Sequence, residues 1–150
     1  MSFNIVLVEP EIPNNTGNIG RLALASGCHL HLIKPFGFEL SDSRVKRAGL
    51  DYWQHVPLTV YENLNDFLIQ HGDKNFALFS SHGTQNHWDA DYTDDMFLLF
   101  GKESSGLSQR LVQQYANSLY KIPILSEHVR SLNLANAVSI VVYEAMRQAQ

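Results

Sequence analysis

The chain has 150 residues, of which 45% are hydrophobic and 17% charged; this is the composition of one globular domain rather than of a disordered protein. It has no apolar run near the roughly 18–20 residues that span a bilayer, and it opens without the basic segment and cleavage site of a secretory signal. Its one cysteine, Cys28, excludes an internal disulfide framework and a cysteine-based metal cluster. We therefore expect a single cytoplasmic domain over residues 1–150.

The net charge of −4 hides an uneven distribution. Residues 51–95 hold eight acidic side chains and one basic side chain, whereas residues 1–50 and 96–150 each hold five basic side chains and fewer acidic ones. Nucleic-acid-binding proteins are usually basic. Both ends of this chain can present a basic surface despite the acidic middle, so the net charge alone excludes no class of partner.

The first part of the chain predicts a β-α-β unit. Residues 3–8 form a nearly continuous apolar run, as in a strand that is buried on both faces. Three polar residues at 14–16 are candidate caps for a helix through about residue 26. Residues 29–33 predict a second strand. A unit of this kind indicates a parallel sheet.

The rest of the chain alternates apolar strands with amphipathic helices, so we expect an α/β fold with a mostly parallel sheet flanked by helices. The further helices are predicted over residues 41–48, 62–70 and 108–116, and the further strands over residues 75–80, 96–100 and 119–124. Residues 82–95 are polar and predict a loop. The last helix, over residues 132–148, is apolar around most of its circumference, which predicts burial in its own core or against a second subunit.

Three polar or glycine-rich segments lie beside strand or helix ends, where parallel sheets bind ligands. They are Asn14-Asn15-Thr16-Gly17-Asn18-Ile19-Gly20-Arg21, Phe100-Gly101-Lys102-Glu103-Ser104-Ser105-Gly106-Leu107 and Arg130-Ser131-Leu132-Asn133-Leu134-Ala135-Asn136. None has the glycine spacing of a dinucleotide site or a P-loop. Each segment taken alone also fits ordinary turn and helix-cap chemistry.

Taken together and in this order, the three segments resemble the three motifs of the SPOUT RNA 2′-O-methyltransferases, and the resemblance covers the whole chain. Three further stretches resemble the TrmL (YibK-like) branch. They are the opening Ile-Val-Leu-Val-Glu-Pro-Glu-Ile-Pro-Asn-Asn-Thr-Gly-Asn, the Arg-Ala-Gly-Leu-Asp-Tyr at 47–52 and the closing Val-Val-Tyr-Glu-Ala at 141–145.

The resemblance implies a sheet whose carboxyl-terminal part is threaded into a deep trefoil knot, a feature that no periodicity argument predicts. It implies a homodimer that transfers a methyl group from S-adenosylmethionine to a ribose 2′-hydroxyl and leaves S-adenosylhomocysteine. The implied substrate is the wobble nucleotide of tRNA, a cytidine or modified uridine at position 34, with tRNA-Leu as the implied tRNA. The alternatives are the same reaction on another RNA, such as rRNA, or a module that binds donor or RNA without turnover.

The resemblance also implies roles for individual residues. Backbone groups that hold the methyl donor are expected near Leu78, Gly101, Ile122 and Ser131. Arg21, Glu103 and Asn133 form the expected catalytic set, with Asn133 inside the last helix. Because a guanidinium is hard to deprotonate, we expect Arg21 to clamp phosphate and ribose and to relay the proton, rather than to act as a free base. Glu103 is expected to accept a hydrogen bond from the donor, the ribose or Arg21.

These positions also have structural interpretations. Leu78 and Ile122 fit core positions at strand ends, and Gly101 fits a turn. Ser131 and Glu103 fit helix caps. Arg21 fits a buried ion pair at an interface.

Contacts to RNA phosphates are expected from basic and polar side chains at the surface. The predicted residues are Asn18, Arg44, Lys46, Arg47, Arg130 and Tyr143, with Lys34, Lys102 and Arg110 as further phosphate candidates. No metal is expected, because the methyl donor carries its own activation and because His29 and His31 share a strand face without a third ligand at suitable spacing.

Overall fold

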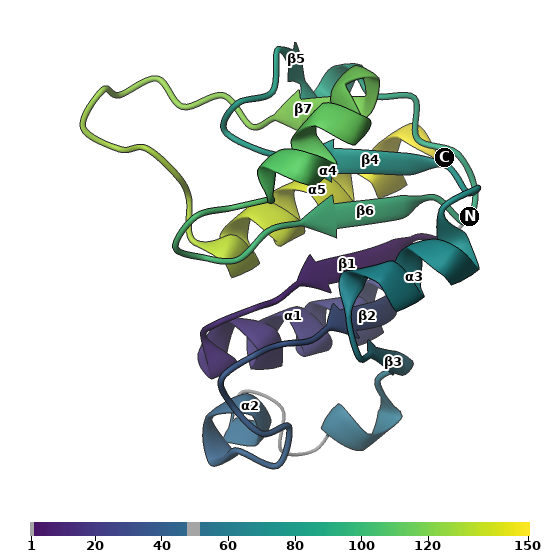
Figure 1. The fold of residues 1–150 in the computed structure, drawn as a ribbon, viewed down its shortest axis with the longest axis vertical. Helices are drawn as coiled ribbons and strands as arrows, with labels where there is room; N and C mark the ends of the chain where they lie inside the picture. The colour runs from purple at the N-terminus through teal and green to yellow at the C-terminus, as the bar shows by residue number, and fades with distance from the viewer. Residues whose placement is uncertain (1, 48–51) are drawn as a thin grey trace.

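The computed structural model describes residues 2–47 and 52–150, in which one parallel sheet lies between two layers of helices (Figure 1). The seven strands described are β1 (Asn4–Val8), β2 (His29–Ile33), β3 (Leu58–Tyr61), β4 (Phe76–Phe79), β5 (Gln85–Asn86), β6 (Phe97–Phe100) and β7 (Leu119–Lys121). Their spatial order is β3-β2-β1-β6-β4-β7-β5, and the strand pairs are parallel. The carboxyl ends of the strands therefore lie along one edge of the sheet, and the direction of strand addition reverses between β1 and β6.

The helices divide between the two faces of the sheet. They are α1 (Pro13–Ser26), α2 (Ser43–Arg47), α3 (Leu64–His71), α4 (Gln109–Gln114) and α5 (Leu134–Gln148), with short 3-10 turns η1 (Trp53–His55), η2 (His87–Asp89) and η3 (Ala116–Ser118). In Figure 1, α1 and α5 lie behind the sheet, and α3 and α4 lie in front of it. No helix of the described residues is long and apolar enough to cross a membrane.

The alternation of side chains along each strand produces two apolar cores. Ile5 and Leu7 of β1 belong to the core under α1 and α5, whereas Val6 and Val8 belong to the core under α3 and α4. All of these side chains are buried. The near-continuous apolar run at residues 3–8 therefore correctly predicted a strand that is covered on both faces.

The last helix has an apolar face toward the sheet and a half-exposed face away from it. Val138, Val141 and Val142 are fully buried in the α1–α5 core. Ile140 is 40% and Tyr143 49% exposed, so the apolar circumference that the sequence predicts is only partly covered within one chain.

The starts of α1 and α5 differ from the sequence-based expectation. The prediction that the polar residues at 14–16 cap α1 is wrong. Helix α1 begins at Pro13, and its N-cap residue is Ile12, which has no side-chain acceptor. Proline is well placed at a first helical position because its missing N–H would have no intrahelical partner there. Helix α5 begins at Leu134, so Asn133 is its N-cap rather than a residue inside it, and Asn133 Oδ1 accepts a hydrogen bond from the Asn136 backbone N–H.

Other differences lie in short or polar elements. Strand β3 was not predicted, because Leu58, Thr59 and Val60 are half-exposed at the sheet edge and lack a buried run. The predicted loop over 82–95 contains β5 and η2, and β5 consists of two polar residues with no hydrophobic signal. Strand β7 ends at Lys121, earlier than expected, and Pro123 follows two residues later. Part of the predicted helix over 41–48 lies outside the described residues, and α2 covers Ser43–Arg47.

Candidate active site

A cleft of about 460 Å³ lies at the carboxyl ends of β4, β6 and β7. The loops that follow these three strands line it, together with the start of α1 at Ile12 and Asn15. Its apolar lining is contributed by Phe79, Phe100, Ile122, Ile124, Leu132 and Leu134. The cleft therefore brings parts of all three sequence segments to the sheet edge at which α/β proteins bind ligands.

The loop after β6 is tightly closed and needs glycine. A Cβ atom at Gly101 would lie 2.0 Å from the carbonyl carbon of Gly106 and 2.2 Å from the Leu107 nitrogen. Gly106 adopts a left-handed conformation with φ of 72°, and its N–H donates to the Lys102 carbonyl at 2.8 Å. Without a side chain at Gly101, this part of the cleft wall is backbone, which is suited to holding a ligand at close approach.

Glu103 supplies the cap that α1 lacks in its own sequence. Its carboxylate accepts hydrogen bonds from the backbone N–H of Glu11 at 2.8 Å and of Ile12 at 2.9 Å. The same carboxylate accepts from Asn15 Nδ2 at 3.1 Å. A negative charge at this position also interacts favourably with the positive end of the helix dipole. Glu103 thus caps α1, which it reaches from the loop after β6. It does not cap the helix that follows Gly106.

Asn15 joins the three segments through one buried side chain. Its Nδ2 donates to Glu103, and its Oδ1 accepts from Asn133 Nδ2 at 3.1 Å. Ile19 and Ala23 follow Asn15 on the buried face of α1, and Thr16 is the other buried polar residue there. A buried amide needs partners, and this one takes them from segments that lie 88 and 118 positions away.

Asn15 was not predicted as a site residue. The signal that could have found it is its spacing of four from Ile19 and eight from Ala23, which places it on the buried face of a helix.

Acidic residues after β1 hold the β6 loop in place. Glu9 forms an ion pair with Lys102 at 3.1 Å. The carboxylate of Glu11 accepts a hydrogen bond from the Ser104 backbone N–H at 2.8 Å, and this bond is the main cause that lowers the pKa of Glu11. Lys102, a candidate for phosphate contact, is therefore already paired within the chain.

The residues predicted to hold the donor are brought together in part. Gly101, Ile122 and Ser131 line the cleft. Leu78 is fully buried in the core under α3 and α4. The residues of that strand end that line the cleft are Phe79 and Ser80.

Arg21 is separated from the other two predicted catalytic residues. Glu103 and Asn133 line the cleft, whereas Arg21 is exposed on α1 and does not. Its guanidinium carbon lies 5.5 Å from the centre of the Tyr52 ring, a cation–π contact. Burial raises the pKa of the Tyr52 hydroxyl, and the Arg21 charge counteracts part of that effect. One chain alone does not assemble the predicted catalytic set.

The predicted RNA contacts occupy several surfaces. Asn18 is exposed on α1, Tyr143 is half-exposed on α5, and Arg130 is exposed at the cleft. Arg44 is exposed and pairs with Asp42 at 2.8 Å. The side chains of Lys46 and Arg47 lie outside the described residues.

Two further phosphate candidates already have partners within the chain. Lys34 pairs with Glu62 at 3.4 Å, and Arg110 donates to Asn65 Oδ1 at 3.0 Å.

His29 and His31 belong to the fold rather than to the cleft, which they do not line. His31 is buried, with Nδ1 2.8 Å from the Tyr61 hydroxyl and Nε2 2.9 Å from Asn4 Oδ1. Its ring stacks on that of His29. Within residues 2–47 and 52–150, no group of three or more His, Cys, Asp or Glu side chains is arranged to hold a metal ion.

Residues 2–143 match the model of the SpoU rRNA Methylase family. A relative from Saccharophagus degradans, named tRNA (cytidine(34)-2′-O)-methyltransferase, is 44% identical over 147 residues that cover 97% of this chain and 95% of its own. A relative from Bacillus subtilis, which carries the same name provisionally, is 44% identical over 99% of this chain and 94% of its own.

Solved structures give the same picture. One, from work on "2-OH methylation of C/U34 on tRNA", is 43% identical and superposes with a TM-score of 0.94, covering 99% of this chain and 96% of that one. The SpoU methyltransferase AviRb from Streptomyces viridochromogenes, solved with AdoMet, is 25% identical with a TM-score of 0.85. That match covers 97% of this chain and 57% of AviRb.

Proposed function

Because the chain belongs to the SpoU rRNA methylase family, we propose that it is a homodimeric enzyme that methylates the ribose 2′-hydroxyl of the nucleotide at position 34 of tRNA, with S-adenosylmethionine as the donor. The observation that carries the proposal is the cleft in which Asn15 links Glu103 to Asn133. Relatives that are 44% identical over nearly the whole chain carry the name of this reaction, which supports position 34 over another RNA site.

The cleft fits the proposed donor in size and in chemistry. Gly101 leaves a backbone cradle that a Cβ would fill, and Ile122 provides an apolar side for an adenine ring. Ser131, also in the lining, offers a hydroxyl and a backbone N–H for polar groups of the ligand. When bound, S-adenosylmethionine supplies a methyl group that is activated by its positively charged sulfur.

The protein must then position the ribose and manage the proton of its 2′-hydroxyl. Glu103 and Asn133 are held rigidly by Asn15, so they orient groups in the cleft without rearrangement. A guanidinium has donors in a fixed fork that matches phosphate geometry. Arg21 therefore clamps the substrate phosphate and ribose, and it relays the proton by holding the phosphate oxygen that accepts it from the 2′-hydroxyl and passes it to water.

We place Arg21 of the partner subunit at each cleft, because the Arg21 of the same chain does not line it. The exposed apolar side chains Ile12, Ile140 and Tyr143 of α1 and α5 support an interface between two copies on that face. In Figure 1 the two helices lie on the same side of the sheet. The trefoil knot and the cytoplasmic location remain predictions.

The test uses purified protein and S-adenosylmethionine with a tritiated methyl group, in separate reactions with total tRNA and with ribosomal RNA from a strain that lacks the gene. We expect label on the 2′-oxygen at position 34 after digestion and mapping. Label in ribosomal RNA instead would support the same reaction but with ribosomal RNA as the substrate. Binding of the donor without label in any RNA would favour the non-catalytic module.

The proposed dimer has its own readout. Sedimentation at micromolar concentration should give twice the chain mass of 17.0 kDa. A stable monomer with full activity would contradict the shared site.

A further inference from the structure

A second groove lies beside the cleft, on the side of the β5 edge. It has a volume of about 590 Å³ and runs between β5–η2 and the segment after β7. Ser81, Ile122, Ile124 and Arg130 line both the cleft and this groove. The two hollows share these walls, so a polymer whose ribose lies at the cleft can extend into the groove.

Trp88 gives the groove an aromatic wall. Its side chain lines the groove and is 48% exposed, which is unusual for so large an apolar group. Lys121 and Arg130 line the same groove and carry positive charge, and Asn86 adds an amide. An exposed aromatic face next to cations is the arrangement with which proteins stack a nucleobase and contact its phosphate.

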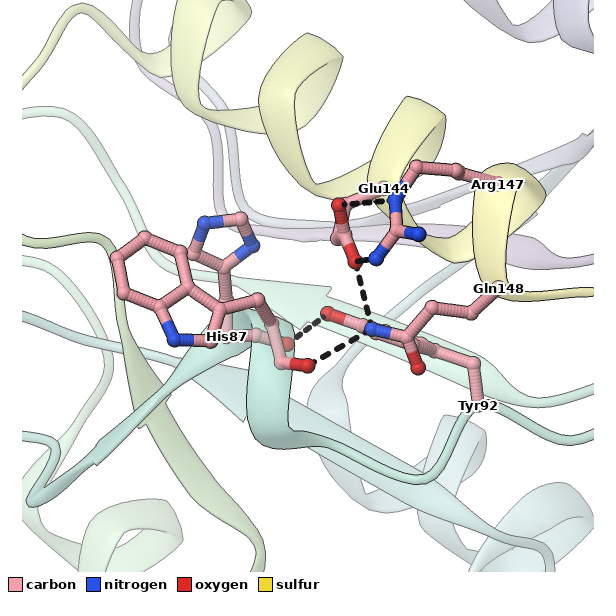
Figure 2. A network of polar contacts seen from close by, with 6 residues as sticks. His87, Tyr92, Glu144, Arg147 and Gln148 are labelled. Atoms are coloured by element: carbon pink, nitrogen blue, oxygen red, sulfur yellow. Dashed lines mark hydrogen bonds and ion pairs between the residues drawn. The ribbon is translucent and has the colours of Figure 1, made fainter.

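The turn η2, which carries Trp88, is held to α5 by a polar network (Figure 2). The Trp88 carbonyl accepts a hydrogen bond from Gln148 Nε2 at 2.8 Å, and Gln148 also donates to Glu144 at 2.6 Å. The preceding carbonyl, of His87, accepts from the buried Tyr92 hydroxyl at 2.6 Å.

The acidic member of this network stays ionised. The hydrogen bonds from Arg147 and then Gln148 lower the pKa of Glu144 to about 2. The indole is therefore presented by a turn that is fixed before any ligand arrives, which reduces the entropy lost on binding.

We propose that the Trp88 groove, lined by Asn86, Trp88, Lys121 and Arg130, binds the base of a nucleotide next to the methylated one, with the indole stacked on that base. The inference rests on the proposed function, because it needs an RNA at the cleft. The rival occupant is a second copy of the chain, against which Trp88 and the 46% exposed Val129 would pack.

The first experiment measures methylation of an RNA stem–loop that contains position 34. Trp88→Ala should raise KM roughly tenfold and change kcat by less than about twofold, because the lost stacking is a binding interaction remote from the methyl group. Trp88→Phe, which keeps an aromatic face, should restore most of the affinity. The matched control is Ile69→Ala, since Ile69 is an exposed apolar residue of α3 that lines neither hollow.

The second experiment identifies the base and does not need turnover. The emission of Trp88, obtained as the difference between wild type and Trp88→Phe, should be quenched by the stem–loop. A stem–loop that lacks the base on one side of position 34 should bind the wild type more weakly, by about as much as Trp88→Ala weakens binding of the intact stem–loop. The same missing base should not weaken binding to Trp88→Ala any further.

An unquenched Trp88, or equal sensitivity to the missing base in both proteins, would overturn the groove assignment. Loss of the dimer in sedimentation of Trp88→Ala would overturn it in favour of the second copy. If quenching occurs as expected but the wild type methylates no RNA, the proposed function fails while the groove stands.

Discussion

Asn15 contacts two partners that come from different loops at the sheet edge, Glu103 and Asn133. Asn15→Ala leaves the half-buried Glu103 carboxylate and the exposed Asn133 amide short of one bond each. We expect the free energy of unfolding to fall by about 0.5–1.5 kcal/mol and donor affinity to fall, because the two loops lose their common anchor. Urea denaturation and calorimetric titration with S-adenosylhomocysteine measure both effects. Asn14→Ala, one residue away and exposed, is the control; equal losses in the two variants would contradict the role of Asn15.

His31 links the stability of the protein to pH. Burial, with smaller contributions from His29 and His71, lowers its pKa from the usual 6.5 to about 3. His31 is therefore protonated below about pH 6.5 in the unfolded chain, but only below about pH 3 in the folded chain. The contribution of His31 is fully present above pH 6.5 and is lost as pH falls, by up to about 1.4 kcal/mol per pH unit.

His31→Gln removes this titration. The variant should be less stable at pH 8, because Tyr61 and Asn4 lose a partner, but its stability should fall less steeply between pH 6.5 and 4. Denaturation curves across that range provide the measurement. His82→Gln, at an exposed position, should keep the wild-type slope, and a wild-type slope in His31→Gln would contradict the assignment.

At the scale of elements, α1 depends on Glu103, which is 91 positions away from the N-cap residue Ile12. Glu103→Ala removes the acceptor for the Glu11 and Ile12 N–H groups, so we expect a loss of about 1–2 kcal/mol in unfolding free energy. Glu103→Gln, which keeps one acceptor oxygen, should lose less. Glu127→Ala, in the exposed loop before α5, provides the comparison. A Glu103→Ala protein as stable as that control would exclude the capping role.

The elements that the sequence predicted well are those with strong local signals. Strands β1, β4 and β6 are nearly continuous apolar runs covered on both faces, and glycine ends α1 in a left-handed conformation with φ of 71° at Gly27. The elements it missed, β3 and β5, pair at the edges of the sheet and have partly polar or half-exposed residues. Their pairing depends on a neighbouring strand that is distant in sequence, which no local pattern contains.

The candidate site shows the same division. That Gly101, Glu103 and Ser131 meet at one cleft followed from the motifs and from a parallel sheet, in which loops after strands share an edge. The cap on α1 and the role of Asn15 could not be predicted, because they depend on how three loops pack together. The separation of Arg21 from the cleft likewise appears only when the helix faces are placed in space.

At the scale of the whole molecule, the proposed dimer joins the cleft of one chain, which Arg21 of that chain does not line, to the exposed Arg21 on α1 of its partner. In a two-fold symmetric dimer, each chain contributes to the partner's site the same residues that the partner contributes to its own site. The apolar face of α1 and α5, half-exposed in one chain, is the surface expected to join the copies. We therefore propose that each active site is shared between two subunits.

The most direct test is activity of a purified heterodimer that combines Arg21→Ala in one subunit with Gly101→Ala in the other. The first change should remove methyl transfer with donor binding retained, and the second should close the cradle, because its Cβ would collide with Gly106. Each homodimeric variant should be inactive. In the heterodimer, one of the two sites has both an intact cradle and an intact Arg21, so we expect about half of the wild-type turnover. A heterodimer as inactive as its parents, with fold and dimer intact, would show that Arg21 acts within its own chain.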